Sequence, residues 1–196
     1  SIDNEYVGYI VINDIIKTEA KEVINELKTL GIYKTYMLTG DKKEVAFDIG
    51  NKLGIDKIKY ELLPHEKLSN FEQIKKETNM VTAFVGDGIN DAPTLANADI
   101  SFAMGGVGSD LAIKSADIIL LNDNIQAIVD AIKIAKKTKT IVYQNIVFIM
   151  LVKVGFLLLG ADGLISMKEA IFADVGVALL AIFNSMRILN TIKDKK

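Results

Sequence analysis

The first residues that could do chemistry lie in the run Gly86–Asp91, which reads GDGIND. It holds two carboxylates four residues apart, Asp87 and Asp91, with the amide of Asn90 between them. Oxygen atoms of this kind suit Mg²⁺ held beside a phosphate. The two glycines allow a sharp turn and a close approach of backbone to ligand. Asp91 is also a candidate helix N-cap, but a turn and a cap leave Asp87 unexplained. The run therefore predicts a magnesium and phosphate site.

A second candidate loop is Thr39-Gly40-Asp41. A hydroxyl and a free backbone N–H at a strand-to-helix turn can bind phosphate oxygens. The same three residues also form ordinary turns, which stays open as an alternative for this loop alone. Thr39, Gly40 and Asp41 are therefore candidates for binding a phosphate-bearing cofactor.

Lys67 follows the segment Leu63-Pro64-His65-Glu66, close to the start of an expected helix. A positive charge there is unfavourable for the helix dipole. A lysine that neutralises a phosphoryl group would explain the position, and so would a solvated surface lysine. His65 is the only histidine and has no cluster of partners, so we interpret it as a loop residue.

The elements that must position these loops alternate between strands and helices. The expected strands are Tyr6–Ile12, Thr35–Leu38, Lys57–Leu62, Met80–Val85, Ile100–Met104 and Asp117–Leu121. The expected helices are Thr18–Leu30, Lys42–Leu53, Glu66–Glu77, Asp91–Ala96, a short one near Ser109–Ser115, and Ile125–Lys139. This order predicts an α/β fold with a mostly parallel sheet and helices on both faces. Ligands of such sheets bind at the carboxyl ends of strands, where the candidate loops fall.

The composition excludes several classes of protein. A length of 196 residues allows one domain, or one small domain with an appendage. A hydrophobic content of 50% excludes wholesale disorder, and the absence of cysteine excludes disulfides and thiolate metal sites within the chain. A formal net charge of −2 argues against a nucleic-acid partner bound by a basic surface. The first residue is Ser1 and no signal peptide opens the sequence, which predicts a processed chain or a piece of a longer one.

Two apolar runs, residues 141–161 and 170–190, distinguish the last part of the chain from the charged residues 1–140. A helix of 21 residues rises about 31 Å, which is enough to cross a hydrocarbon layer of about 30 Å. Two buried helices of a soluble core are the alternative, which the limited length of residues 1–140 disfavours. The short link 162–169 makes the two spans an antiparallel hairpin.

Basic residues flank the outer ends of this hairpin. They are Lys133, Lys136, Lys137 and Lys139 before the first span, and Arg187, Lys193, Lys195 and Lys196 at the end of the second. The link carries Lys168 against Asp162 and Glu169. Because cytoplasmic flanks are enriched in Lys and Arg, we expect residues 1–140 and the tail 191–196 in the cytoplasm and the loop 162–169 outside it.

A charged residue interrupts each apolar run, Lys153 in the first and Asp174 in the second. Such a residue costs roughly 2.5–3.5 kcal/mol on insertion scales, so the two are expected to neutralise each other. An arriving divalent cation can be bound by the Asp174 carboxylate, and Lys153 can supply positive charge once the cation leaves. The alternative is that Asp174 only reaches to the outer interface.

Three motifs together resemble a known family. LTGD at Leu38–Asp41, the segment Pro64–Lys67 and GDGINDAP at Gly86–Pro93 are similar to the phosphorylation domain of P-type ATPases, a branch of the haloacid dehalogenase fold. The stretch Ala98–Leu121, ADISFAMGGVGSDLAIKSADIILL, and both spans continue the resemblance. It implies that residues 1–140 are the C-terminal portion of such a domain and that the protein is a multi-pass protein of the cell membrane.

The spans resemble one subclass of these pumps. Lys153 and the segment Phe172-Ala173-Asp174-Val175-Gly176 are similar to the zinc, cadmium and lead exporters, whose last two spans carry a Lys and an Asp-x-Gly. Copper pumps instead show Met and Ser residues in the last span and cobalt pumps a His-Glu pair, and neither pattern occurs here. The resemblance implies a divalent heavy-metal cation and the lipid bilayer as partners, with Mg²⁺ and ATP as cofactors.

The sequence also departs from the family. The Asp-Lys-Thr-Gly-Thr motif of the phosphorylated aspartate, the nucleotide-binding domain and the Cys-Pro-Cys membrane helix do not occur in these 196 residues. The resemblance therefore implies the C-terminal part of a pump, inactive alone and partnered by the actuator, nucleotide domain and other membrane helices. A truncated regulatory fragment stays open. A membrane-anchored phosphatase of the same fold is disfavoured, because Asn13-Asp14 lacks the following Thr.

The resemblance and the chemistry together imply a role for each candidate residue. Thr39 would hydrogen-bond the phosphoryl oxygens and Lys67 would stabilise their charge. Asp87 would hold Mg²⁺ with support from Asp91, and Asn90 would position phosphate or the attacking water. The helix from residue 125 would transmit movement of the phosphorylation domain to the charges in the spans.

Overall fold

The computed structural model describes residues 15–86, 89–105, 114–121, 124–164 and 166–189. The chain divides into two compact units, residues 1–127 and 128–196. The strand expected at Tyr6–Ile12, most of the short helix expected near Ser109–Ser115, and the tail 191–196 lie outside the described residues.

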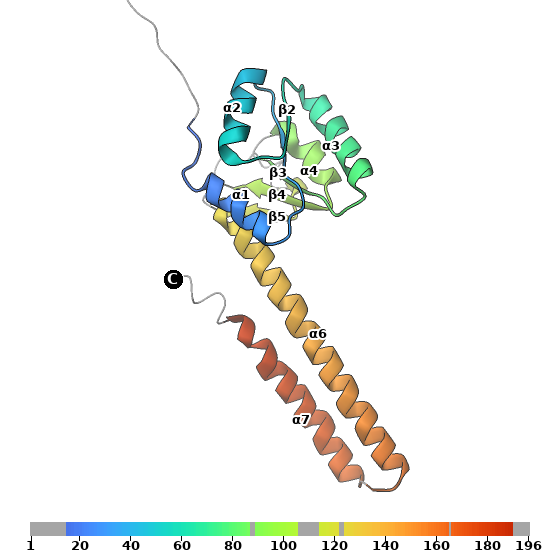
Figure 1. Cartoon of the computed structure of the whole chain (residues 1–196). Coiled ribbons are helices and arrows are strands. Elements are labelled where there is room, and N and C mark those ends of the chain that lie inside the picture. The colour runs from blue at the N-terminus through green and yellow to red at the C-terminus, as the bar shows by residue number, and fades with distance from the viewer. Residues whose placement is uncertain (1–14, 87–88, 106–113, 122–123, 165, 190–196) are drawn as a thin grey trace, which may run out of the picture. The chain divides into compact units, whose positions relative to one another are not determined.

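The strands of the first unit form two sheets in which every described pairing is parallel (Figure 1). One sheet pairs β1 (Tyr36–Leu38) with β2 (Lys57–Lys59). The other has the order β3 (Ala83–Gly86), β4 (Ile100–Met104) and β5 (Ile118–Leu120). The expectation of an α/β fold with parallel strands is confirmed.

Helices precede and connect these strands, as the sequence periodicity predicts. They are α1 (Ala20–Thr29), α2 (Lys43–Leu53), α3 (Pro64–Thr78), the short 3₁₀ turn η1 (Ile89–Asp91) and α4 (Ala92–Asn97). Gly54 ends α2 with a φ of 74°, which glycine adopts without steric cost. At the start of α3, the carboxylate of Glu66 accepts a hydrogen bond of 2.8 Å from the backbone N–H of Leu63.

The strand β2 ends at Lys59, whereas the sequence predicts a strand to Leu62. Glu61 has a φ of 55°, so the chain leaves the extended conformation there. The N–H groups of Glu61 and Leu62 then donate to the carbonyl oxygens of Asp41 and Thr39 at 2.9 and 3.0 Å. The chain thus leaves the ladder in order to bond to the candidate loop at residues 39–41.

The core of the first unit lies between α4 and its neighbouring strands. Leu95 of α4 and Ala103 of β4 are buried to 1% and 0% exposure, and Phe84 packs against them. The ring of Phe84 meets that of Phe71 from α3 edge to face, with 5.5 Å between centroids. This packing fixes the carboxyl end of β3 between α3 and α4.

An aspartate before a strand bonds to the start of the neighbouring strand at three places. In each case one carboxylate oxygen accepts hydrogen bonds of 2.7–2.9 Å from a backbone N–H and from the hydroxyl of the same residue. The pairs are Asp56 with Thr35, Asp99 with Thr82, and Asp117 with Ser101. These contacts lie at the amino ends of the strands, opposite the end that carries the candidate loops.

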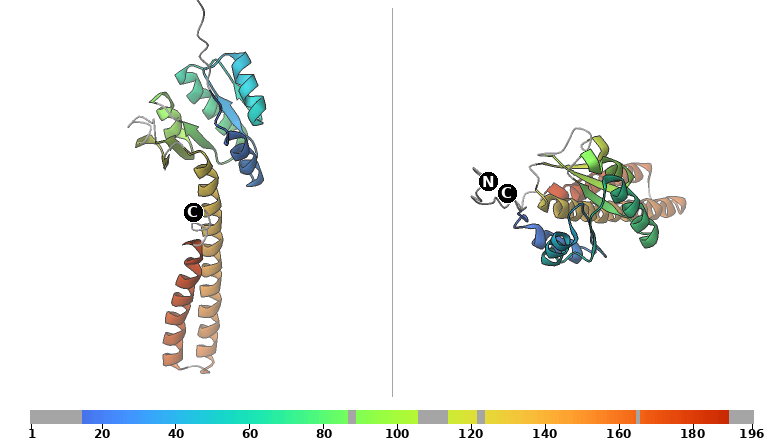
Figure 2. Two further views of the ribbon diagram at one scale, coloured as in Figure 1. Left: turned by 90° about the vertical axis from the view of Figure 1, so that its left-hand side faces the viewer. Right: turned by 90° about the horizontal axis from the view of Figure 1, so that it is seen from above.

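The second unit is formed by α6 (Gln126–Ala161), whose first two residues belong to the first unit, and α7 (Met167–Ser185). Figures 1 and 2 show the two helices side by side and antiparallel. The prediction that the helix from residue 125 runs directly into the first span is confirmed. A capping box between Ser166 and Glu169 starts α7 at Met167, before the expected start of the span.

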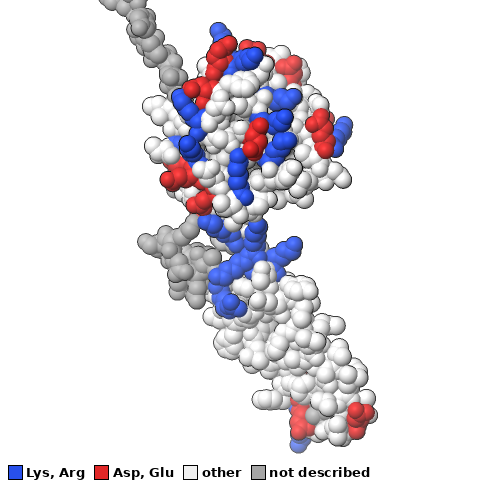
Figure 3. Space-filling model, viewed as in Figure 1, with Lys and Arg blue, Asp and Glu red and all other residues white. Residues whose placement is uncertain are grey.

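Both helices are long and apolar enough to cross a membrane. On the face shown in Figure 3, the helix pair is uncharged along most of its length, with basic groups near the start of α6 and both acidic and basic groups at the turn between the helices. This charge distribution matches a transmembrane hairpin with a basic flank.

Candidate functional site

Lys67 and Asp91 form an ion pair at the carboxyl end of β3. The Nζ of Lys67, in the first turn of α3, lies 3.0 Å from Oδ1 of Asp91, in the turn after β3. The side chains are only 21% and 9% exposed, so water screens the pair weakly. The structure thus brings together two residues that the sequence indicated separately.

The Asp91 carboxylate fits closely against Gly86. A Cβ atom added at Gly86 would lie 2.9 Å from Cβ and 3.2 Å from Oδ2 of Asp91, closer than ordinary packing allows. Asp91 occupies the N-cap position of α4, but its side chain makes no capping hydrogen bond, so the cap interpretation is wrong for the side chain. The pair with Lys67 uses that carboxylate instead.

The loop at residues 39–41 is closed by its own side chains. The Thr39 hydroxyl donates to the Asp41 carboxylate at 2.7 Å and accepts the Asp41 N–H at 3.1 Å. A Cβ added at Gly40 would lie 3.3 Å from the carbonyl oxygen of Leu62, so this backbone approach favours glycine. The loop keeps a hydroxyl and a carboxylate together at the end of β1.

The segment that follows β2 connects this loop to the ion pair. It bonds to Thr39 and Asp41, as described above, and α3 with Lys67 begins immediately after it. Among the described residues, no hydrogen bond or ion pair joins Thr39 directly to Lys67 or Asp91. Asn90 is exposed in η1, and Asp87 lies outside the described residues.

The chemistry of these donors fits a magnesium ion bound together with a phosphate. Asp91 offers a shielded carboxylate beside a lysine, and Mg²⁺ in proteins is commonly held by one or two carboxylates plus phosphate oxygens. In the part of the chain that the structure describes, no group of three or more His, Cys, Asp or Glu side chains could hold a metal ion alone. A phosphate would supply further oxygen ligands to such a site.

A second charged pair lies within the helical hairpin. Lys153 Nζ on α6 is 2.9 Å from Asp174 Oδ1 on α7, and the side chains are 57% and 62% exposed in the chain alone. In hydrocarbon, two opposite charges at this distance would neutralise each other. The structure therefore brings together the two intramembrane charges that the sequence singled out.

Sequence reasoning missed a polar cluster elsewhere in the hairpin. Asn145 of α6 makes hydrogen bonds to Asn184 and Ser185 of α7. The available signal was the presence of amide and hydroxyl side chains inside apolar runs, where they commonly bond across helices.

Comparison with known proteins supports the resemblance. Residues 1–99 match the haloacid dehalogenase-like hydrolase family. The chain is 48% identical over 197 residues to the cadmium, zinc and cobalt-transporting ATPase of Bacillus subtilis, which covers 100% of this chain and 28% of that protein. It is 49% identical over 189 residues to the zinc-transporting ATPase of Synechocystis, covering 96% of this chain and 26% of the relative.

The structure gives the same relationship. The crystal structure of a zinc-transporting PIB-type ATPase in the E2·Pi state matches with a TM-score of 0.82 and 35% identity, over 90% of this chain and 28% of that one. The chain thus spans little more than a quarter of the length of these relatives. It belongs to the haloacid dehalogenase-like hydrolase family, and within that family it is similar over its full length to the zinc- and cadmium-transporting P-type ATPases.

Proposed function

We propose that the chain is the C-terminal part of an ATP-driven exporter of Zn²⁺, Cd²⁺ or Pb²⁺ that works through an aspartyl-phosphate intermediate. The observation that carries the proposal is the Lys153–Asp174 ion pair, inside a hairpin that continues directly from a haloacid dehalogenase-like domain. Two charges in apolar helices are costly, and they commonly mark an ion pathway.

In this proposal residues 1–140 belong to the phosphorylation domain, 141–161 and 170–190 are spans, 162–169 is the outer loop, and 191–196 is a cytoplasmic tail. The basic flank at the start of α6 supports this orientation. The aspartate that accepts the phosphoryl group would come from the part of the pump that precedes this chain.

The cytoplasmic site would stabilise the transferred phosphoryl group. Thr39 would donate its hydroxyl hydrogen to a phosphoryl oxygen after leaving Asp41, with Gly40 and Asp41 shaping the loop. Lys67 would turn from Asp91 to the phosphoryl charge, a movement that needs only the end of a flexible side chain.

Asn90 and the two aspartates would complete this site. Asp87 and Asp91 would hold Mg²⁺, which when bound would neutralise phosphate charge. Asn90, which is exposed in η1, would orient the phosphate or the attacking water. P-type ATPases generally depend on Mg²⁺ and ATP, and these oxygen donors suit that requirement.

In the membrane, the cargo cation would replace Lys153 as the partner of Asp174. The carboxylate would bind the cation, and Lys153 would return to it after release, so that the emptied site stays neutral. The continuous helix α6 would carry movement of the phosphorylation domain to this pair.

The proposal is tested by reconstituting the complete pump in lipid vesicles. ATP should drive uptake of Zn²⁺, Cd²⁺ or Pb²⁺ and produce a hydroxylamine-sensitive phosphoenzyme. A complete pump that hydrolyses ATP without any response to these cations would contradict the proposed cargo.

A further inference from the structure

A cluster of amide and hydroxyl groups joins α6 to α7 away from the ion pair. Asn145 of α6 lies opposite Ala181, Asn184 and Ser185 of α7. Its Nδ2 donates to the carbonyl oxygen of Ala181 at 3.1 Å and to the hydroxyl of Ser185 at 2.9 Å. Its Oδ1 accepts a hydrogen bond of 2.8 Å from the amide of Asn184. Asn145 therefore uses three of the four hydrogen bonds that an amide side chain can make.

The partners on α7 are themselves held in place. Arg187 donates to the amide oxygen of Asn184 at 2.9 Å, and the Ser185 hydroxyl donates to the Ala181 carbonyl at 2.9 Å. These bonds within α7 orient the groups that face α6. The helix thus presents a prearranged polar surface to a single side chain.

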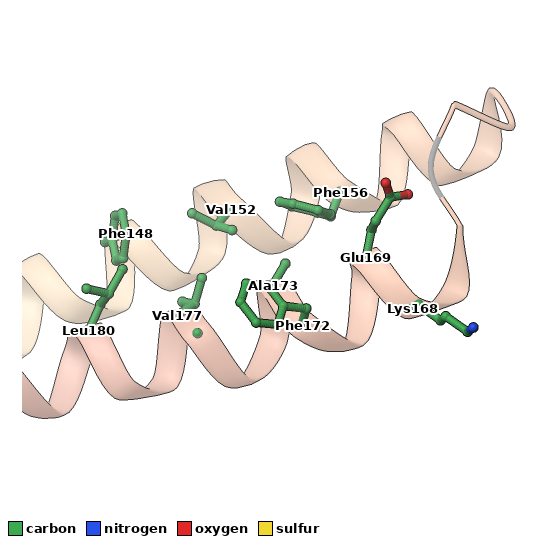
Figure 4. Close-up of a pocket in the computed structure, with 10 residues that line it drawn as sticks. Phe148, Val152, Phe156, Lys168, Glu169, Phe172, Ala173, Val177 and Leu180 are labelled. Atoms are coloured by element: carbon green, nitrogen blue, oxygen red, sulfur yellow. The ribbon is translucent and has the colours of Figure 1, made fainter.

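Apolar packing does little to fix the alignment of this helix pair. A groove of about 820 Å³ opens between the facing apolar residues, among them Phe148 and Val152 of α6 and Phe172 and Val177 of α7 (Figure 4). Only 6% of the most apolar stretch of α6 is buried within the chain, and 11% of that of residues 171–189. In lipid, such faces also gain no hydrophobic energy from pairing, so polar contacts decide the register.

One register satisfies both polar contacts between the helices. Lys153 lies eight residues after Asn145 on α6, a rise of about 12 Å. On the antiparallel α7, Asp174 precedes Ala181 by seven residues and Asn184 by ten. A slip of one helical turn would separate Asn145 from its partners and would also displace Asp174 from Lys153.

We propose that Asn145 is a positioning residue that holds α7 in register with α6 while the Lys153–Asp174 pair is open. The inference rests on the proposed function, in which the cargo cation takes the place of Lys153 beside Asp174. At that stage one polar contact between the helices is lost, and the Asn145 cluster keeps the alignment. Lys153 and Asp174 then still lie opposite each other once the cation has left, so the ion pair can re-form without a shift of α7 along α6.

The structural test removes the ion pair and measures the register directly. Lys153→Cys and Asp174→Cys are introduced together in the complete pump, and the rate at which the two cysteines form a disulfide is followed. The 196 residues contain no native cysteine, so the mass of the linked peptide identifies the bond. Adding Asn145→Leu should slow the reaction about three- to tenfold, the range expected for interhelical hydrogen bonds in a membrane.

The matched control is Gln144→Leu, which removes the neighbouring amide from α6. Gln144 is exposed and shows no hydrogen bond within the described residues, so its loss should leave the rate unchanged. Asn184→Leu should reproduce the slowing, and the double variant with Asn145→Leu should be no slower than either single one, because both act in one network. An unchanged rate in Asn145→Leu, or equal slowing in Gln144→Leu, overturns the proposal.

A functional measurement separates this inference from the proposed function. With Lys153 and Asp174 intact, Asn145→Leu should lower zinc-stimulated ATP turnover several-fold, whereas Gln144→Leu should not. A wild-type pump without cation-stimulated turnover would contradict the proposed function, while the disulfide rates would still decide the role of Asn145. Normal turnover in Asn145→Leu despite slowed disulfide formation would overturn the positioning role.

Discussion

Lys67 donates to Asp91 across 3.0 Å although 24 positions separate the two residues in the chain. The pair joins the first turn of α3 to the turn after β3, and both side chains are largely shielded from water. Removing one partner of a shielded pair leaves the other charge uncompensated. Each residue therefore compensates the charge of the other, at the edge of the sheet where a phosphate would bind.

Replacing Lys67 with methionine keeps most of the side-chain volume and removes the charge. In the complete pump we expect the rate of phosphoenzyme formation to fall by a factor on the order of 10²–10³, because a donor aimed at developing charge is lost. The exposed Lys76 on the same helix provides the control, since Lys76→Met should leave the rate nearly unchanged. Equal rates in the two variants would remove Lys67 from the site.

Asp87→Asn should abolish phosphorylation from ATP in the complete pump by weakening Mg²⁺ at the phosphate. Binding of the cargo cation, measured by metal content, should survive because it takes place in the hairpin. Asp48→Asn, which breaks an exposed pair with Lys52 on α2, is the matched control and should phosphorylate normally. Normal phosphoenzyme in Asp87→Asn would exclude the magnesium role.

Asp174→Ala should eliminate zinc- or cadmium-stimulated ATP hydrolysis and lower the metal content of the purified pump. It also leaves Lys153 without its partner in the span, so the amount of inserted protein should drop. Adding Lys153→Ala should restore insertion but not transport. If Asp174→Ala binds and exports zinc like the wild type, the carboxylate is not a ligand.

The 196-residue chain alone should form no acyl-phosphate, because the proposed nucleophile belongs to the preceding part of the pump. Incubation with γ-³²P-ATP followed by acid quenching and hydroxylamine treatment measures this. A hydroxylamine-sensitive label on the isolated chain would contradict the proposal that it is only part of the enzyme.

Acid should destabilise the first unit through the three aspartates that bond to strand starts. Hydrogen bonds from Lys75 and Thr82 lower the pKa of Asp99 to about 2, and hydrogen bonds from Ser101 lower that of Asp117. The pKa of Asp56 is lowered mainly by Thr35 and Lys28. Because the unfolded chain takes up these protons first, this stabilisation is complete above pH of about 4 and is lost as the pH falls toward 2.

Circular dichroism during urea unfolding of the lipid-embedded chain measures this dependence. The urea midpoint should fall between pH 5 and pH 3 in the wild type. Asp99→Asn should lower the midpoint at pH 7 and reduce its change with pH. Asp48→Asn, whose partner is an exposed lysine, should keep the wild-type dependence.

The order of helices and strands followed from apolar periodicity, because each element buries one face that the sequence marks. Elements whose ends depend on distant contacts were less predictable. The chain leaves the strand after β2 because Glu61 and Leu62 bond to the loop at residues 39–41. No local sequence pattern predicts the φ of 55° at Glu61. Helix α7 starts early for a local reason, the Ser166–Glu169 capping box.

In the candidate site too, the residues were predictable from local sequence but their contacts were not. Residue type and loop composition pointed to Lys67 and Asp91, but only the fold shows that they pair, which makes Asp91 an ionic partner instead of a cap. The link between Asp99 and Thr82 spans 17 positions, so it has no sequence signature beyond an aspartate before a strand. The roles of Thr39, Asn90 and Asp87 remain predictions for the experiments above.

The uninterrupted course of α6 has a mechanical consequence. Its 36 residues amount to a rod of about 54 Å, roughly 24 Å longer than a hydrocarbon layer. Both prolines of the chain lie elsewhere, and the first glycine of α6, Gly155, comes after Lys153. Sharp helix kinks commonly arise at proline and glycine positions, and α6 has neither before the lysine. A tilt applied at the first turn would therefore be carried along one continuous helix to Lys153, and the stiffness of α6 becomes a property that mutations can change.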